Sequence, residues 1–169
     1  HDQQRGRLGA ATGRLATRAQ LEDVFKSVME EAHDLMGADR SSLFLVSDDA
    51  SSLWSIVAHG SDPIRVPISS GIAGHVATHG EILNIADAYS DQRFDRTHDQ
   101  LSGFRTQTVL CAPVFRVEAA GEDEEEEVAA VADTGVMGVV QLINKGGGPV
   151  TRADEAMLES LCTHISTAV

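Results

Sequence analysis

The sequence predicts an α+β domain in which a mostly antiparallel sheet carries helices on one or both faces. Three observations support this prediction. Apolar residues recur at three-and-four spacing near each end of the chain, which is typical of amphipathic helices. Short apolar runs separated by turn residues lie between these helices and are typical of strands. A chain of 169 residues that is 42% hydrophobic is long enough for one domain with a buried core.

The first third of the chain is expected to form a helix followed by a β-hairpin. Residues 1–17 hold almost no large apolar residues and are expected to be a loose lead-in or a helical linker from a preceding domain. The domain itself is expected over residues 18–169, and its first helix over about 18–36. Strands are expected over 42–46 and 53–59, joined by turn residues.

The middle of the chain alternates short elements with a long irregular segment. An extended piece over 64–68 precedes a helix start and a short helix over 69–78, and a brief strand follows over 82–85. Residues 87–105 are polar and show no clear period. Long segments of this kind in compact domains are usually functional or disordered, so this segment is a candidate for a functional role.

The last third is expected to form a second hairpin and a closing helix. Strong strands are expected over 106–117 and 136–144. Between them, at about 118–134, lies an acidic insertion whose like charges keep it solvated; a role in binding a partner is the weaker alternative. Thr151 is expected to cap the last helix together with Asp154 three residues on, as a short capping box.

Charge and composition restrict the possible partners. The formal net charge of −13 argues against nucleic-acid binding through a basic face and against docking on an anionic membrane. No stretch is long and apolar enough to cross a bilayer, and no signal peptide is visible, so a cytoplasmic protein is expected, cut from a larger one. Cys111 and Cys162 lie in apolar runs and are expected to be buried hydrophobes.

The stretch Ser70-Gly71-Ile72-Ala73-Gly74 is a candidate anion site. Its two glycines allow a tight turn and close approach of a ligand to the backbone. If a helix begins here, its first N–H groups have no partner within the helix and point toward the positive end of the helix dipole. Such a helix start can hold one phosphate without a basic side chain, although a plain tight turn is the simpler interpretation of these residues alone.

Three long stretches carry a family resemblance. These are residues 66–89 (VPISSGIAGHVATHGEILNIADAY), 102–114 (SGFRTQTVLCAPV) and 138–145 (GVVQLINK), the last followed by Asp154 and Glu155. In order and spacing they resemble the regulatory GAF domains of cyclic-nucleotide phosphodiesterases. The resemblance implies a GAF fold with a six-stranded antiparallel sheet flanked by helices, and terminal helices packed together. It also implies a cyclic nucleotide, cGMP or cAMP, buried under a lid formed by residues 87–106.

The resemblance also implies which residues contact the ligand. Backbone amides hold the cyclic phosphate at the helix start, a serine and a glutamine on strands face the base, and the lid adds three side chains. An alanine stands where relatives place an aromatic ring against the base, and the histidine beside it is expected to substitute in part. The implied contacts are Ser42, Ala58, His59, Ile72, Ala73, Asp99, Ser102, Thr106 and Gln141.

A second set of family positions is expected to be structural. Asn144, Lys145, Asp154 and Glu155 match the family's signature, and Val150 replaces its phenylalanine. Lys145 and Asp154 are expected to form an internal salt bridge that holds the last strand to the last helix. None of these side chains is expected to touch the ligand.

Enzyme interpretations find less support in the sequence. His33-Asp34 and His98-Asp99 each resemble half of a metal-hydrolase pair, but the further ligands that such a centre needs are missing. His75 and His79 share a helix face, and two ligands do not make a site. We therefore expect a non-catalytic domain that has no metal or cofactor.

Two functional hypotheses follow from the sequence. In the first, the domain binds cGMP or cAMP and allosterically controls an attached effector, expected to be a 3′,5′-cyclic-nucleotide phosphodiesterase, with a nucleotide cyclase as the weaker alternative. In the second, it is a ligand-free GAF module for dimerisation or interaction, which the alanine at position 58 favours. A homodimer through the terminal helices is expected. The sequence does not choose between the two bases, because the Gln141 amide can both donate and accept.

Overall fold

The computed structural model describes residues 2–60, 62–117 and 135–168, with side chains from residue 19 onward. The acidic insertion expected at 118–134 lies outside the described residues. The chain forms a six-stranded sheet of order β3-β2-β1-β6-β5-β4, in which all neighbours are antiparallel. The predicted α+β fold with six antiparallel strands is thus confirmed. The strands are β1 (Arg40–Val46), β2 (Ser52–His59), β3 (Arg65–Pro67), β4 (Leu83–Ile85), β5 (Val109–Phe115) and β6 (Val136–Ile143).

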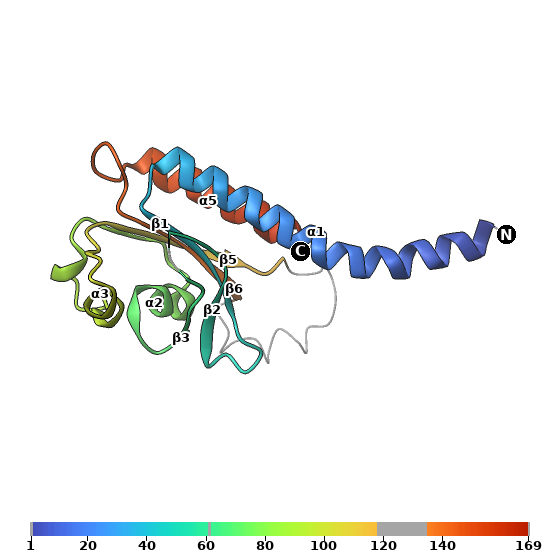
Figure 1. The fold of residues 1–169 in the computed structure, drawn as a ribbon, viewed down its shortest axis with the longest axis horizontal. Coiled ribbons are helices and arrows are strands. Elements are labelled where there is room, and N and C mark those ends of the chain that lie inside the picture. The colour runs from blue at the N-terminus through green and yellow to red at the C-terminus, as the bar shows by residue number, and fades with distance from the viewer. Residues whose placement is uncertain (1, 61, 118–134, 169) are drawn as a thin grey trace.

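The two terminal helices, α1 (Asp2–Met36) and α5 (Arg152–Ala168), lie side by side over one face of the sheet, as predicted (Figure 1). Each buries an apolar stripe against that face. The buried stripe residues are Phe25, Val28, Met29, Ala32 and Met36 on α1, and Leu158, Leu161, Cys162 and Ile165 on α5.

Helix α1 begins at Asp2, well before the start expected near residue 18. The residues before 18 include three Ala, three Arg and two Gln, which favour a helix, and the three Gly among them do not interrupt it. The N-terminal part of α1 therefore continues as one helix beyond the sheet (Figure 1).

The opposite face of the sheet carries α2 (Gly71–His79), the 3-10 turn η1 (Ala88–Ser90) and α3 (Thr97–Ser102) (Figure 1). Helix α2 packs Ile72 and Val76 into a second apolar cluster with Phe44 and Val139 of the sheet. Gly74 permits this close packing, because a Cβ there would lie 2.3 Å from the Ile68 carbonyl oxygen. Helix α3 was not expected, and it lies within the segment that lacks a sequence period.

The strand register decides which side chains face α2. Ser42 of β1 lies opposite Gln141 of β6 on one side and opposite Ala58 of β2 on the other. Successive residues of a strand point to opposite faces. Ser42 and Gln141 therefore share the α2 face of the sheet, whereas Ser41 and Leu43 point toward α1.

Candidate functional site

A cavity of about 650 Å³ lies between the α2 face of the sheet, the start of α2 and the lid, residues 87–106. Pockets for small ligands and cofactors are commonly about 300–1,000 Å³ in volume, so this cavity has a suitable size. Most of the ligand contacts implied by the sequence meet here. The lining includes Arg40, Ser42, Phe44, Ser70, Gly71, Ile72, Ala73, Phe94, Asp99, Ser102, Thr106 and Gln141.

The floor of the cavity is a polar pair on adjacent strands. Ser42 and Gln141 stand opposite each other across β1 and β6, and Ser42 is only 9% exposed. Within the described part of the chain, neither side chain makes a hydrogen bond to another protein group. Their hydroxyl and amide are therefore available to a ligand that offers donors and acceptors.

The wall opposite the sheet contains the start of α2. Ser70 occupies the N-cap in an extended conformation and makes no side-chain cap hydrogen bond, and Gly71 takes a positive φ of 78°. Ile72 and Ala73 follow and line the cavity. The first N–H groups of a helix have no partner within it, and the helix dipole makes this end positive. The wall can therefore hold an anionic group.

The lid contributes Asp99, Ser102 and Thr106 to the cavity, but their polar atoms are already engaged. The buried Asp99 carboxylate accepts hydrogen bonds from Tyr89 Oη at 2.7 Å, Thr106 N at 2.7 Å and Thr106 Oγ1 at 2.9 Å. Ser102 Oγ donates to the His98 carbonyl oxygen at 2.7 Å. In this conformation these three residues shape the cavity wall and hold the lid together.

The structure does not bring Ala58 and His59 to the cavity lining. Ala58 shares the face of Ser42, but it lies outside the lining. His59 lies opposite Ser41, and its ring is 5.4 Å from that of His33 on α1. His59 faces α1 because a bulge in β2 shifts the register between the two ends of the strand.

Arg40, which was not predicted as a site residue, carries a positive charge into the cavity lining. Its guanidinium carbon lies 3.7 Å from the centre of the Phe104 ring in the lid. Its Nε is buried and has no hydrogen-bond partner in the described structure. The signal was present in the sequence, because Arg40 precedes Ser42 by two residues and alternation places both on one face.

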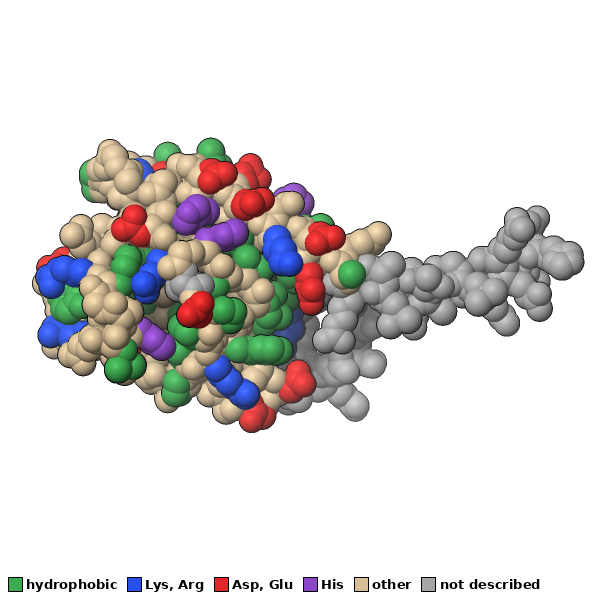
Figure 2. All heavy atoms as spheres, viewed as in Figure 1, with side chains coloured by type: hydrophobic (Ala, Val, Ile, Leu, Met, Phe, Trp, Pro, Cys, Tyr) green, Lys and Arg blue, Asp and Glu red, His purple; other side chains and the backbone are tan. Residues whose placement is uncertain are grey.

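Charge is unevenly distributed over the visible face of the molecule. Figure 2 shows acidic side chains along α1, whereas Lys and Arg side chains gather at the α3 end. The cavity lies on the α3 side of the sheet. The cavity lining itself holds Asp62, Asp95 and Asp99 beside Arg40, so an anionic ligand would depend on the positive groups nearest to it, Arg40 and the start of α2.

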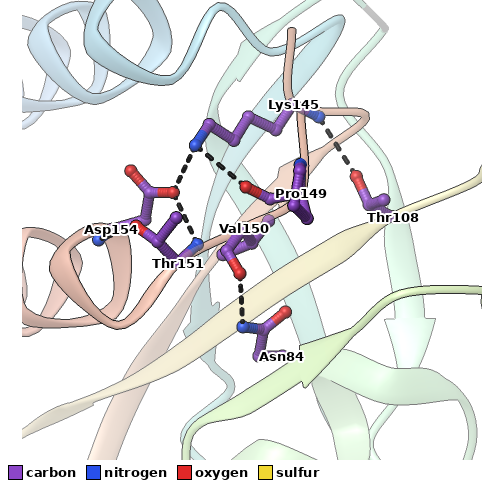
Figure 3. Close-up of polar contacts among 7 residues, drawn as sticks. All are labelled: Asn84, Thr108, Lys145, Pro149, Val150, Thr151 and Asp154. Atoms are coloured by element: carbon purple, nitrogen blue, oxygen red, sulfur yellow. Dashed lines mark hydrogen bonds and ion pairs between the residues drawn. The ribbon is translucent and has the colours of Figure 1, made fainter. Parts of the chain in front are cut away.

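The signature residues Lys145 and Asp154, which the sequence predicts to pair, form an ion pair at 2.5 Å (Figure 3). Lys145 Nζ also donates to the Pro149 carbonyl oxygen at 3.1 Å. Thr151 N donates to Asp154 Oδ2 at 2.8 Å, and Asp154 N donates to Thr151 Oγ1 at 3.2 Å, so the predicted capping box is present (Figure 3). Burial raises the pKa of Asp154, but hydrogen bonds from Lys145 and Thr151 outweigh it and lower that pKa overall.

The other two signature residues, Asn144 and Glu155, form hydrogen bonds with main-chain groups. Asn144 Oδ1 accepts from the N–H groups of Gln107 at 2.6 Å and Thr108 at 3.2 Å, and its Nδ2 donates to the Arg105 carbonyl oxygen at 3.0 Å. Asn144 thus fastens the end of the lid to β6. Glu155 donates its main-chain N–H to Thr151 at 3.1 Å, within the first turn of α5.

The thiols and possible metal ligands offer no reactive cluster in the described residues. Burial raises the pKa of Cys111 well above its ordinary value and that of Cys162 to about 12, so both thiols stay protonated at neutral pH. Among residues 2–60, 62–117 and 135–168, no three His, Cys, Asp or Glu side chains gather as metal ligands do. None of the described helices has the length and apolarity needed to cross a bilayer.

The chain belongs to the GAF family, because the family model of the GAF domain matches residues 20–169. It is also similar to a probable 3′,5′-cyclic phosphodiesterase, pde-5, of Caenorhabditis elegans, with 33% identity over 163 residues. That match covers 88% of this chain and 20% of the relative, so the chain spans about a fifth of that protein's length. The resemblance stated from the sequence is confirmed.

Solved structures agree on the fold. A GAF domain from a phosphoenolpyruvate-protein phosphotransferase of Coxiella burnetii matches with a TM-score of 0.69 at 19% identity, covering 88% of this chain and 81% of that one. A type II free methionine-R-sulfoxide reductase from Thermoplasma acidophilum matches with a TM-score of 0.67 at 14% identity, covering 90% and 94%. The same fold occurs in a domain of a phosphotransferase and in a sulfoxide reductase, so the fold alone does not identify the function of this chain, and its cavity must be considered.

Proposed function

We propose that this GAF domain binds a cyclic nucleotide, cGMP or cAMP, in the cavity and thereby regulates an attached effector. One observation carries the proposal: Ser42 and Gln141, whose side chains make no hydrogen bond to the described residues, line the same cavity as the positive end of α2. A cyclic nucleotide has a neutral base with donors and acceptors at one end and a single negative charge at the other. The floor suits the base, and the helix start suits the cyclic phosphate.

The position of the lid supports a regulatory role. The lid forms one wall of the cavity, and Asn144 fastens its end to β6. The next residue, Lys145, binds Asp154 in the first turn of α5. A change in the lid is therefore joined by direct contacts to a terminal helix. A ligand shifts such an equilibrium only by binding one arrangement more tightly than the other.

We propose a 3′,5′-cyclic-nucleotide phosphodiesterase as the effector. The support is the similarity to the C. elegans relative, of which this chain matches 20%. In the alternative, the domain is a dimerisation module through its terminal helices. The exposed Leu35 on α1, with 61% of its surface accessible, supports a contact of this kind.

The test is calorimetric titration of the 169-residue chain with cGMP and with cAMP, with thermal midpoints measured in parallel. A ligand that binds only the folded state raises its stability by RT ln(1 + [L]/Kd). Ala73→Leu fills the cavity wall, and Ala156→Leu makes the same change at an exposed position of α5. We expect binding of one nucleotide at micromolar or lower Kd, lost in the first variant and kept in the second.

Failure would be equally clear. The absence of heat and of a thermal shift with millimolar cGMP and cAMP would overturn the proposal. Sedimentation of the same protein would then test the dimerisation module, which predicts a dimer weakened by Leu35→Glu.

A further inference from the structure

Tyr89 is the centre of a contact network inside the lid. It lies in η1, whereas its hydroxyl partner Asp99 lies in α3, and Tyr89 Oη donates to Asp99 Oδ2 at 2.7 Å. The same carboxylate accepts the N–H and the hydroxyl of Thr106, just before β5. Asp99 is 6% exposed and Thr106 is 2% exposed. One buried carboxylate therefore joins the beginning, middle and end of the lid.

The ring of Tyr89 is held in place from several sides. The guanidinium carbons of Arg105 and Arg96 lie 4.4 Å and 4.9 Å from its centre, and the Phe94 ring centre lies 5.3 Å away. Arg96 Nη2 also donates to the Tyr89 carbonyl oxygen at 2.8 Å. Cations over an aromatic face attract it electrostatically. These contacts restrict the conformation of the Tyr89 side chain and orient its hydroxyl toward Asp99.

We propose that Tyr89 and Asp99 form a latch that holds the cavity wall of residues 99–106 in place and thereby sets how long a bound cyclic nucleotide stays. Tyr89 is absent from the cavity lining, so it is a positioning residue that acts through Asp99. Asp99, Ser102 and Thr106 line the cavity, and the bonds of the latch hold Asp99 and Thr106 directly. The inference rests on the proposed function, because the residence time refers to cGMP or cAMP.

The latch differs from the role that the sequence assigned to Asp99, which was direct contact with the ligand. Asparagine at position 99 has the same shape as aspartate. Its oxygen can accept from Tyr89 Oη and Thr106 N, and its NH₂ can donate to Thr106 Oγ1. Asp99→Asn therefore keeps the latch, and Asp99→Leu removes it. A direct ligand contact through the negative charge would instead be lost in both variants.

The decisive variant is Tyr89→Phe, which removes the hydroxyl and keeps the ring. The experiment measures dissociation of fluorescent mant-cGMP and mant-cAMP by stopped flow, together with hydrogen exchange of the Thr106 amide. We expect dissociation to accelerate about tenfold, the effect of losing one hydrogen bond to a charged group, and Thr106 exchange to accelerate as well. Asp99→Asn, whose carboxamide can keep the hydrogen bonds of the latch, is expected to accelerate dissociation less than Asp99→Leu, and Asp99→Leu is expected to follow Tyr89→Phe.

A matched control is available on the same 3-10 turn. Ser90 Oγ donates to Asp87 Oδ2 at 2.7 Å, and Ser90 is not among the residues that line the cavity. Ser90→Ala removes a hydroxyl hydrogen bond of the same length and is expected to change neither readout. An equal effect of Ser90→Ala and Tyr89→Phe would overturn the latch, because the turn as a whole would then be responsible.

The two proposals fail in distinguishable ways. A wild-type chain that binds neither nucleotide would overturn the proposed function and the residence-time role with it. Thr106 exchange in the unliganded protein still decides whether the latch holds the wall. Wild-type exchange and dissociation rates in Tyr89→Phe would overturn the latch while leaving cyclic-nucleotide binding intact.

Discussion

Replacing Lys145 by methionine tests the link between the last strand and the last helix. Methionine matches the lysine side chain from Cβ to Cε but lacks the terminal ammonium, so Asp154 loses its only ion-pair partner in the described structure. The Lys145 and Asp154 side chains are 16% and 18% exposed. Breaking a fully buried pair costs about 3–5 kcal/mol. Because this pair keeps some solvent contact and Asp154 retains the Thr151 N–H, we expect a loss of about 2–3 kcal/mol.

Equilibrium unfolding in urea, followed by circular dichroism, measures this loss. For a domain of this size, each kcal/mol lowers the melting temperature by about 2–4 °C, so a decrease of about 4–12 °C is expected. Lys26→Met makes the same change at an exposed position of α1 and serves as the control. In Lys145→Met/Asp154→Leu no buried charge remains, so part of the stability should return. A Lys145→Met loss no larger than that of Lys26→Met would refute the argument.

Three further predictions concern the start of α5, helix α2 and the residue that follows β6. The folded-state pKa of Asp154 lies below its ordinary value of 3.8. Its contribution to the free energy of unfolding is therefore complete above pH 3.8 and is lost as the pH falls through the folded-state pKa. Urea unfolding between about pH 7 and 3 should show this loss of stability, and the loss should be smaller in Lys145→Met. Gly74→Ala places a Cβ 2.3 Å from the Ile68 carbonyl oxygen, so we expect a loss above about 2 kcal/mol in thermal unfolding, and a melting temperature equal to the wild type's would contradict the packing. Asn144→Gly tolerates the positive φ of 59° and removes the side-chain hydrogen bonds, so amide exchange at Gln107 and Thr108 should accelerate while exchange within β1 stays unchanged.

Much of the fold could be predicted from the sequence, because its helices and strands follow from the spacing of residues within short segments. The apolar stripes of α1 and α5 follow helical spacing, and the alternating strands carry their inward residues at every second position. The capping box of α5 spans only Thr151 to Asp154. Each of these patterns needs no knowledge of the rest of the chain. The start of α2 was also predicted from a local pattern, the glycines at positions 71 and 74. Its expected role as a phosphate site was inferred from helix physics together with the family resemblance.

The lid could not be derived in this way. Helix α3 has six residues, too few for a period, and its start depends on Asp95, whose carboxylate accepts from Thr97 N at 2.9 Å. Tyr89 and Asp99 are ten residues apart, and Asn144 and Gln107 are 37 apart. Side-chain partners at such separations meet only when the chain is folded, so no local pattern predicts them.

The sequence by itself determined most of the elements and the family, because spacing along the chain sets periodicity and local capping, and it predicted a set of residues as ligand contacts. Only the tertiary structure decided which of those residues face the cavity. Counting by twos along β2 from the buried Leu53 would place His59 on the cavity face. The bulge that pairs Leu43 with Val57 but Phe44 with Ser55 reverses this parity, so His59 faces α1. A bulge is settled by the pairing of two strands, and neither strand contains that information alone.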